Sequence, residues 1–232
     1  MAWNFGAQIN ALTQFDGNDT GASEEGENYS TLATQWLTDA AKEVMNLLPP
    51  DLKMECATIT QLTSSTPMDL DATGEIFHVT RENADDGYHI GCRKVNPIHA
   101  GSADDSTSLH YATATDPIYW SESDTSGDPK LFVKPNPSAN QPARVHHMAF
   151  PSVSYNGTAI VNFPDEAEYL VVLRAAITAA QYKLNFEEDI ELYAPMLSSL
   201  KTQYQEGIYV LKSGNLAAPK KDVRIAQEKG TK

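Results

Sequence analysis

Six histidines are the side chains of this sequence with the widest chemical range, because imidazole binds metals and exchanges protons near neutral pH. His78, His89 and His110 fall in different predicted strands, and on one sheet face they could hold zinc. His146 and His147 are adjacent, so in a strand they point to opposite faces and cannot bind one metal together. Because no ligand spacing typical of zinc sites is present, we expect packed or exposed histidines and no metal.

The segment Asp69–Gly74 loosely matches the first six positions of a calcium-binding loop. The match fails at the twelfth position, which is Thr80 where the loop needs a bidentate glutamate. The flanking residues also predict strands rather than the helices that enclose such a loop. We therefore expect a solvated turn here, and the sequence indicates no cofactor.

Signatures of enzymes are absent from the sequence. It contains no H-E-x-x-H, no G-x-S-x-G, no phosphate-binding loop and no dinucleotide-binding glycine pattern. With 31 acidic residues, no carboxylate pair stands out as an acid–base pair, and we expect the adjacent aspartates to be solvated loop charges. These pairs are Asp85-Asp86 and Asp104-Asp105. The sequence therefore predicts that the protein is not an enzyme.

The aromatic residues Tyr111, Tyr119 and Trp120 could stack a sugar ring or a base. A place in a β core or a subunit contact is the stronger expectation, since large aromatic side chains dominate both. Cys56 and Cys92 are the only cysteines, and we interpret both as reduced thiols of the core.

Helical patterns occur at the two ends of the chain. Residues 3–15 predict a short helix, and residues 29–48 predict a long one with apolar side chains at the i, i+3, i+4 spacing. Asn28 is its expected N-cap, and Pro49-Pro50 ends it.

Two more helices are predicted after Pro164. Residues 165–184 begin with a capping-box-like pair, Asp165 and Glu168, and contain a run of alanines that permits close packing. Residues 185–211 repeat a cap signature and an apolar stripe, although Pro195 should kink or restart this helix.

Residues 53–163 predict short strands separated by turns. Asn156-Gly157 predicts a tight hairpin between Val153 and Ile160. The predicted strands are Ala57–Leu62, Glu75–Thr80, Tyr88–Val95, Ser108–Ala112, Pro117–Trp120, Lys130–Lys134, Val145–Phe150 and Ala159–Phe163. The predicted fold class is thus α+β: a helical bundle of residues 1–52 and 164–211 with a large β-rich insertion, residues 53–163.

Charge is unevenly distributed along the chain. The net charge is −14, yet residues 212–232 hold six basic and two acidic residues and carry +4, which leaves −18 on the rest. An acidic body does not favour binding of nucleic acid, which needs a basic patch. The basic segment is too polar to fold alone, so we interpret it as an arm that lies on another chain. No apolar run is long enough to span a membrane, and no signal peptide is evident.

The helical ends resemble a known family. The run from Trp36 to Pro49 resembles the first bundle helix of tailed-bacteriophage head-to-tail connector (adaptor) proteins, and residues 163–204 resemble the last two. Podophage adaptors of the tail tubular protein A type carry a β-rich insertion in the same place. The resemblance rests on pattern and order in less than half of the chain.

The resemblance implies a virion structural protein that forms a neck ring beneath the portal, at the head–tail interface of a particle made in the host cytoplasm. Its implied partners are the portal protein, the next tail or neck component and further copies of itself, as a cyclic homo-oligomer that is a dodecamer in the family. DNA passes through the acidic lumen without specific binding, because like charges repel.

Particular residues follow from this interpretation. The arm would dock on the portal through Lys212, Lys220, Lys221, Arg224 and Lys229. The ring-building helices would pack through Trp36, Leu37, Val44, Tyr169, Leu173, Ile177, Tyr193, Leu197, Leu200 and Tyr204. Two alternatives stay open: another phage tail protein that is mainly β, such as a tail terminator or baseplate component, and a carbohydrate-binding module with a site around the three aromatic residues.

Overall fold

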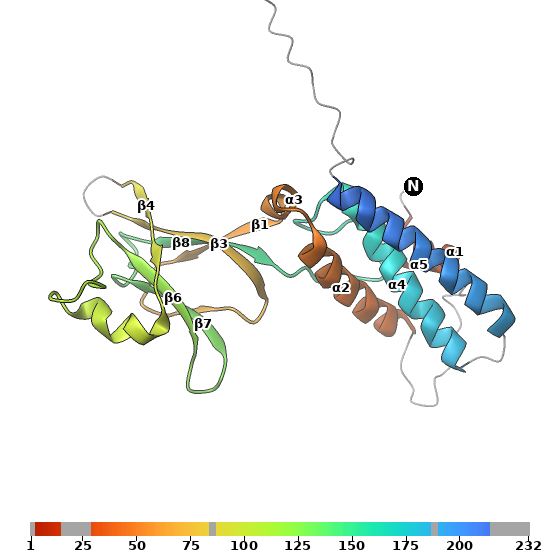
Figure 1. The fold of residues 1–232 in the computed structure, drawn as a ribbon, viewed down its shortest axis with the longest axis horizontal. Coiled ribbons are helices and arrows are strands. Elements are labelled where there is room, and N and C mark those ends of the chain that lie inside the picture. Colours follow the sequence, from red (N-terminus) through yellow and green to blue (C-terminus); the bar gives the residue numbers. More distant parts are fainter. Residues whose placement is uncertain (1–2, 15–28, 84–86, 187–189, 214–232) are drawn as a thin grey trace, which may run out of the picture.

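The computed structural model describes residues 3–14, 29–83, 87–186 and 190–213. These residues form six helices and two four-stranded sheets, so the fold is mixed α+β, as the sequence predicts. Figure 1 shows an elongated molecule with the long helices at one end, both sheets at the other, and α3 and β1 where the two parts meet.

The long helices pack around α4. Helices α1, α2 and α5 each contact α4, and their apolar side chains share one core cluster. Ala175, Ala176, Ala179 and Ala180 of α4 are buried, and their small side chains let the neighbouring backbones approach closely. The bounds are Phe5–Thr13 for α1, Tyr29–Leu47 for α2, Asp165–Phe186 for α4 and Ile190–Lys212 for α5.

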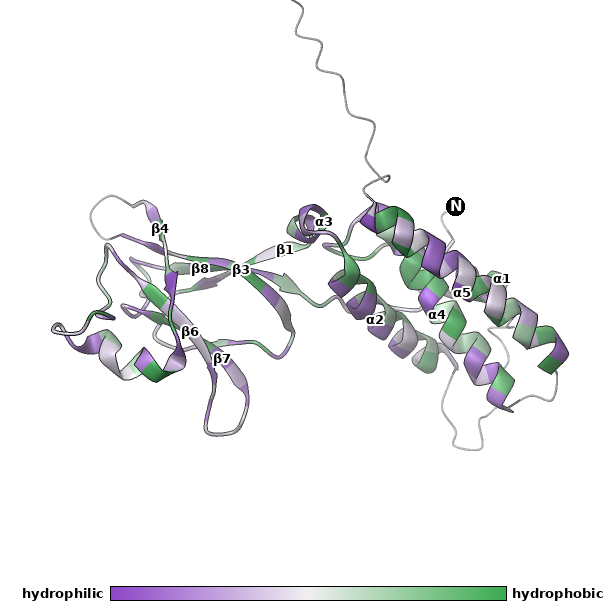
Figure 2. Ribbon diagram, in the orientation of Figure 1, coloured by the Kyte–Doolittle hydropathy of each residue, from purple (hydrophilic) through white to green (hydrophobic). Residues whose placement is uncertain are grey.

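The apolar stripe predicted for residues 29–48 faces this core. Leu37, Val44 and Leu48 are buried, and the ring of Trp36 lies 5.5 Å from that of Tyr182. Figure 2 shows apolar stretches along the helices beside hydrophilic ones, the pattern of helices with one packed face.

Two predicted helix signals take a different form. Glu168 does not cap α4, because its Oε1 accepts a hydrogen bond from the Ile160 N–H at 2.6 Å and so holds the incoming segment. Helix α5 continues through Pro195 rather than restarting there. The predicted cap at Asn28 lies outside the described residues. The cap signature predicted at residue 185 is wrong, because α4 continues through Asn185 to Phe186 and α5 begins at Ile190.

The first sheet has the strand order β1-β8-β3-β4 and is antiparallel throughout. The second has the order β2-β7-β6-β5, in which only the β5–β6 pair is parallel. The strands are β1 Ala57–Leu62, β2 Met68–Asp69, β3 Thr73–Glu82, β4 His89–Gly91, β5 Arg93–Lys94, β6 Ile118–Ser123, β7 Pro129–Lys134 and β8 Ala143–Ala149.

The two sheets share an apolar cluster. Val79 and Val145 come from the first sheet, and Leu131 and Val133 come from the second. Arg81 is buried at the margin of this cluster, where its guanidinium donates to Pro135 O at 2.9 Å and to Gln141 Oε1 at 2.7 Å. These bonds fix the loop between β7 and β8, and nothing in the sequence pattern indicates them.

Several predictions for the middle of the chain are wrong. Residues 108–112 and 159–163 form no strands. Instead, residues 97–104 form a 3-10 helix, η1 (Pro97–Asp104), and residues 50–55 form α3 (Pro50–Glu55).

The predicted hairpin at Asn156-Gly157 is also absent. The backbone of this segment pairs with the start of α1, since Phe5 N–H donates to Gly157 O and Gly6 N–H donates to Tyr155 O, both at 2.8 Å. The first N–H groups of a helix lack partners within it, so they compete with strand pairing for these carbonyl groups.

We predict that Leu37→Ala destabilises the protein by about 2–5 kcal/mol, because it removes buried methyl groups from α2 where α2 faces α4. Thr31→Ala, on the exposed side of the same helix, is the matched control and should change stability little. Denaturant unfolding followed by circular dichroism measures both variants. Equal stability of the two would contradict the core described here.

Candidate functional site

Most of the predicted docking arm lies beyond the part of the chain that the structure describes. Lys212 is the last residue of α5 and is exposed. Lys220, Lys221, Arg224 and Lys229 are outside the described residues. The predicted arm thus begins at the end of α5.

The residues predicted to pack the ring-building helices lie mainly in the chain's own helical part. Leu37, Val44 and Ile177 are fully buried in its core, and Trp36 and Leu197 are partly buried against it. Tyr169 is the member of the set with the most exposed side chain, at 42%. Most of this set is therefore part of the core within one chain.

A polar tie joins three helices of this part. Arg174 Nε of α4 donates to Glu43 Oε2 of α2 at 2.7 Å, and Tyr204 Oη of α5 donates to Glu43 Oε1 at 3.1 Å. Burial raises the pKa of Tyr204 well above its usual value, and the adjacent carboxylate of Glu43 raises it further. The phenol thus remains a donor at neutral pH, and the tie fixes how the helices are positioned relative to one another.

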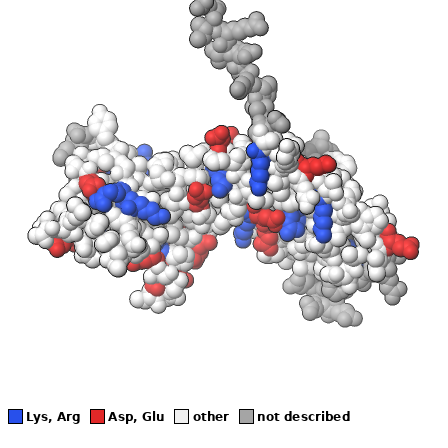
Figure 3. Space-filling view, in the orientation of Figure 1, with Lys and Arg blue, Asp and Glu red and all other residues white. Residues whose placement is uncertain are grey.

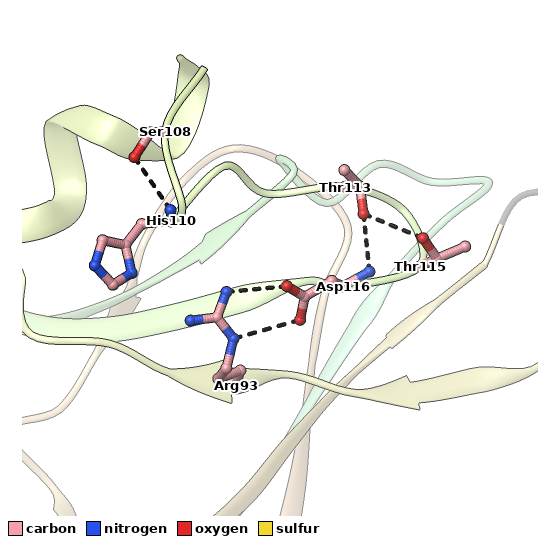
Figure 4. Close-up of polar contacts among 6 residues, drawn as sticks. All are labelled: Arg93, Ser108, His110, Thr113, Thr115 and Asp116. Atoms are coloured by element: carbon pink, nitrogen blue, oxygen red, sulfur yellow. Dashed lines mark hydrogen bonds and ion pairs between the residues drawn. The ribbon is translucent and has the colours of Figure 1, made fainter. Parts of the chain in front are cut away.

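At the β end, residues 97–117 form a loop, here called the braced loop, which is held by side chains of β5 and β7 as well as by its own. Arg93 Nη2 donates to Asp116 Oδ2 at 2.9 Å, and Thr113 Oγ1 accepts from the Asp116 N–H at 2.9 Å (Figure 4). Lys134 Nζ pairs with Asp104 at 2.9 Å. These contacts neutralise two of the carboxylates of the loop and hold its backbone in place.

Large aliphatic side chains of this braced loop face solvent. Leu109 is 89% exposed, and Ile98 is exposed on η1. A rigid loop that presents apolar groups loses little entropy on binding, which suits a contact with another protein. The sequence carried one readable sign of this element: Asn96 caps η1 and Pro97 begins it.

The structure brings His78 and His89 together but not His110. The rings of His78 and His146 stack at 3.9 Å on the outer face of the first sheet, and His89 lies near them, beside Glu82 at 3.9 Å. His110 stacks on His99 at 4.0 Å in the braced loop, far along the chain from these strands. Among the residues described, no three His, Cys, Asp or Glu side chains are placed to hold a metal ion.

His147 points away from His146, as predicted. His147 is buried, and its Nε2 lies 2.9 Å from Thr60 Oγ1. The segment proposed as a failed calcium loop is a turn: Asp69 Oδ1 accepts from the Asp71 N–H at 3.2 Å, and its Oδ2 accepts from Lys130 Nζ at 3.1 Å. Both carboxylate oxygens of Asp69 thus accept hydrogen bonds from groups of the protein.

The three aromatic residues singled out in the sequence do not form one platform. Tyr119 is buried between the sheets, whereas Trp120 points to the opposite face of β6 and stacks on Phe132 at 5.4 Å. Tyr111 is half exposed in the braced loop.

Both cysteines are free thiols, as predicted. Burial raises the pKa of Cys56 to about 11 and that of Cys92 to about 12. Both are therefore protonated and unreactive at neutral pH, since the thiolate is the nucleophile.

Lys, Arg, Asp and Glu side chains all occur on the face shown in Figure 3. On the face shown in Figure 3, acidic and basic groups alternate, and no continuous basic area is visible. Within the described residues, no helix is both long and apolar enough to cross a lipid bilayer. Comparison of the chain with protein-family models gives no match, and comparison with curated proteins gives none either.

We predict that stability falls as the pH drops below about 6.5, the usual pKa of histidine. Burial lowers the pKa of His146 and of His147, and His78, Arg144 and His89 lower that of His146 further. The unfolded chain therefore takes up protons first as the pH falls, which removes stability present above that pH. Urea unfolding at pH 7.5 and 5.5 measures the loss. Each of the variants His146→Gln and His147→Gln should lose less stability between the two pH values than the unmodified chain. A loss as large as that of the unmodified chain in both variants would contradict this assignment.

We predict that Tyr204→Phe costs about 1.5–3 kcal/mol, because it removes a hydrogen bond to a charged acceptor. Tyr209→Phe is the matched control on the same helix, since Tyr209 is exposed. A double-mutant cycle with Glu43→Gln, read by thermal unfolding, should show coupling for Tyr204 and none for Tyr209. Additive effects at Tyr204 would contradict the tie.

Proposed function

We propose that the protein is a virion structural protein, the subunit of a head-to-tail adaptor ring beneath the portal. One observation carries the proposal: helices from both ends of the chain pack in one core, while every described strand lies between them in sequence and the two sheets extend away from the helices (Figure 1). We read this as a helical bundle of residues 1–52 and 164–211 with an inserted β-rich part, residues 53–163, which is the arrangement of the adaptor family.

The charge distribution supports a conduit. The first 211 residues carry −18, and an acidic ring would repel DNA phosphates and let the DNA pass. The visible face has no continuous basic area that would retain DNA. Which acidic residues line the lumen depends on how copies pack.

Two separate places on the subunit suit two different partners. Helix α5 ends beside α3, where the helical and β parts meet, and we assign the basic arm that follows it to the portal (Figure 1). The braced loop lies at the far end of the β part, and we assign that end to the next tail or neck component. An elongated subunit with separate contact sites can join two protein rings and pack beside its own copies in a third.

The alternatives fit less well. A tail terminator or baseplate protein would be mainly β, whereas α2, α4 and α5 alone account for 19, 22 and 23 residues of helix. A carbohydrate-binding module would need its aromatic side chains on one surface, and Tyr119 and Trp120 lie on opposite faces of β6.

We predict that a chain ending at Ser213 folds but no longer binds the portal. Helix α5 is complete at Lys212, so the deletion removes only the arm. Purified portal protein from the same virus is mixed with the full and the shortened chain, and light scattering gives the mass of each mixture. The full chain should shift the portal peak by a ring of copies, and the shortened chain should leave it unchanged.

A charge variant, with fewer basic residues but a full-length arm, tests whether portal binding depends on the charge of the arm. Lys220→Gln, Lys221→Gln and Arg224→Gln together should weaken portal binding and reduce its salt dependence. Lys42→Gln, Lys183→Gln and Lys201→Gln remove the same charge from helices and form the control. Undiminished binding by both the shortened chain and the charge variant would refute the assignment of the arm.

A further inference from the structure

The sheet edges of this protein are unequally protected. Among the described strands, four lie at edges: β1, β2, β4 and β5. Strands β2 and β5 have two residues each and β4 has three, and both residues of β5 are charged, so these edges offer little to an incoming strand. Strand β1 has six residues, A-T-I-T-Q-L, without charge or proline.

The outer edge of β1 is regular and pairs with no described strand. Its register with β8 runs from Ala57 to Leu62 without a bulge, so the strand presents a regular row of backbone groups. The edge also lies where the helical and β parts meet, and no described strand pairs with it (Figure 1). An exposed edge of this kind is a template for a further strand.

Apolar side chains flank this edge. Ile59 of β1 is 57% exposed, and Met54 at the end of α3 is also exposed. Val161 is 81% exposed, and its neighbour Asn162 donates from Nδ2 to Thr58 Oγ1 at 3.2 Å, which holds that segment beside β1. We call these three side chains and the outer edge of β1 the β1 edge patch. Exposed aliphatic groups beside an open edge favour an occupant with apolar side chains of its own.

We propose that the β1 edge patch binds residues 222–227 of a second copy of this chain as an added strand. The segment is D-V-R-I-A-Q, which matches β1 in length and has the alternation of a strand, with Val223 and Ile225 on one side. The segment lies outside the described residues, so its sequence and the point where the described chain ends carry the argument.

The end of α5 places the start of the arm near the patch. Leu211 lies in the same apolar cluster as Cys56, which directly precedes β1, and Figure 1 shows α5 ending on the side of α3. The nine residues 214–222 reach at most about 30 Å when extended. That span reaches a copy packed alongside. The arm carries +4 and the body of each copy −18, so their charges attract.

A second copy is the occupant that fits a ring. The arm of one copy would bind β1 of the next, so the contact joins two different surfaces. Head-to-tail contacts of this kind form a ring when the rotation between copies closes. In an added strand, Val223 and Ile225 would face one way, while Arg224 would face the other and remain available to the portal, and Lys220 precedes the strand. The inference thus rests on the proposed ring, but its contact needs no portal.

A labelled peptide of residues 219–229 tests the contact directly. Fluorescence anisotropy follows its binding to the full chain and to the chain ending at Ser213. We expect saturable binding to both, weakened about tenfold or more by Ile59→Lys, because a lysine on an edge strand opposes pairing. Ile98→Lys, on the exposed surface of η1, is the control and should bind as the unmodified chain does. A peptide with Val223→Asp and Ile225→Asp should not bind.

Every other result overturns the proposal. No binding, or equal binding to the Ile59→Lys and Ile98→Lys variants, would show that the patch is not the site. Binding to the shortened chain alone, with a full chain that light scattering shows to be a monomer, would show that each copy covers its own edge. Circular dichroism verifies that each variant is folded, and Gln61→Lys, which is also exposed on β1, replaces Ile59→Lys if that variant does not fold. Because the portal is absent, these outcomes are independent of the test of portal binding.

Discussion

Burial of α4 on nearly all sides is the interaction on which the rest of the structure depends. Consecutive residues from Leu170 to Leu173 are buried, which is possible only for a helix with neighbours all around. Helices α1 and α2 come from the first part of the chain and α5 from the last, so this burial joins the two ends. The two ends of the β-rich segment are thereby held close together at the helices. The sheets that this segment forms have a hydrophobic core of their own.

The spacing of apolar residues predicted the helices well, because the apolar faces of these helices pack in one core. The segment 29–48 has buried residues at almost every expected position, and β1 has the predicted bounds. Contacts across long sequence separations could not be read in this way. Asn156-Gly157 favours a hairpin locally, yet its carbonyl partners are helix N–H groups about 150 residues away, and the Glu43–Arg174 pair joins two helices with no local signal.

The candidate sites, too, depend on contacts that local sequence patterns do not predict. Residue types alone suggested a histidine cluster and an aromatic platform, but strand alternation put Tyr119 and Trp120 on opposite faces, and topology put His110 in a different loop from His78. What the structure adds is polar side chains used for bracing, as in the loop held by Arg93 and Asp116, beside apolar groups left exposed. Rigid elements with exposed apolar groups are features of an assembly component.

We propose that the protein belongs to a ring at the neck of a viral particle. Cryo-electron microscopy of the virion that carries this chain measures that claim most directly. We predict a ring of density beneath the portal into which the elongated subunit fits, with its α4-centred helices toward the portal and its sheets toward the tail. A neck built without this chain, or this chain located elsewhere in the particle or outside it, would contradict the account.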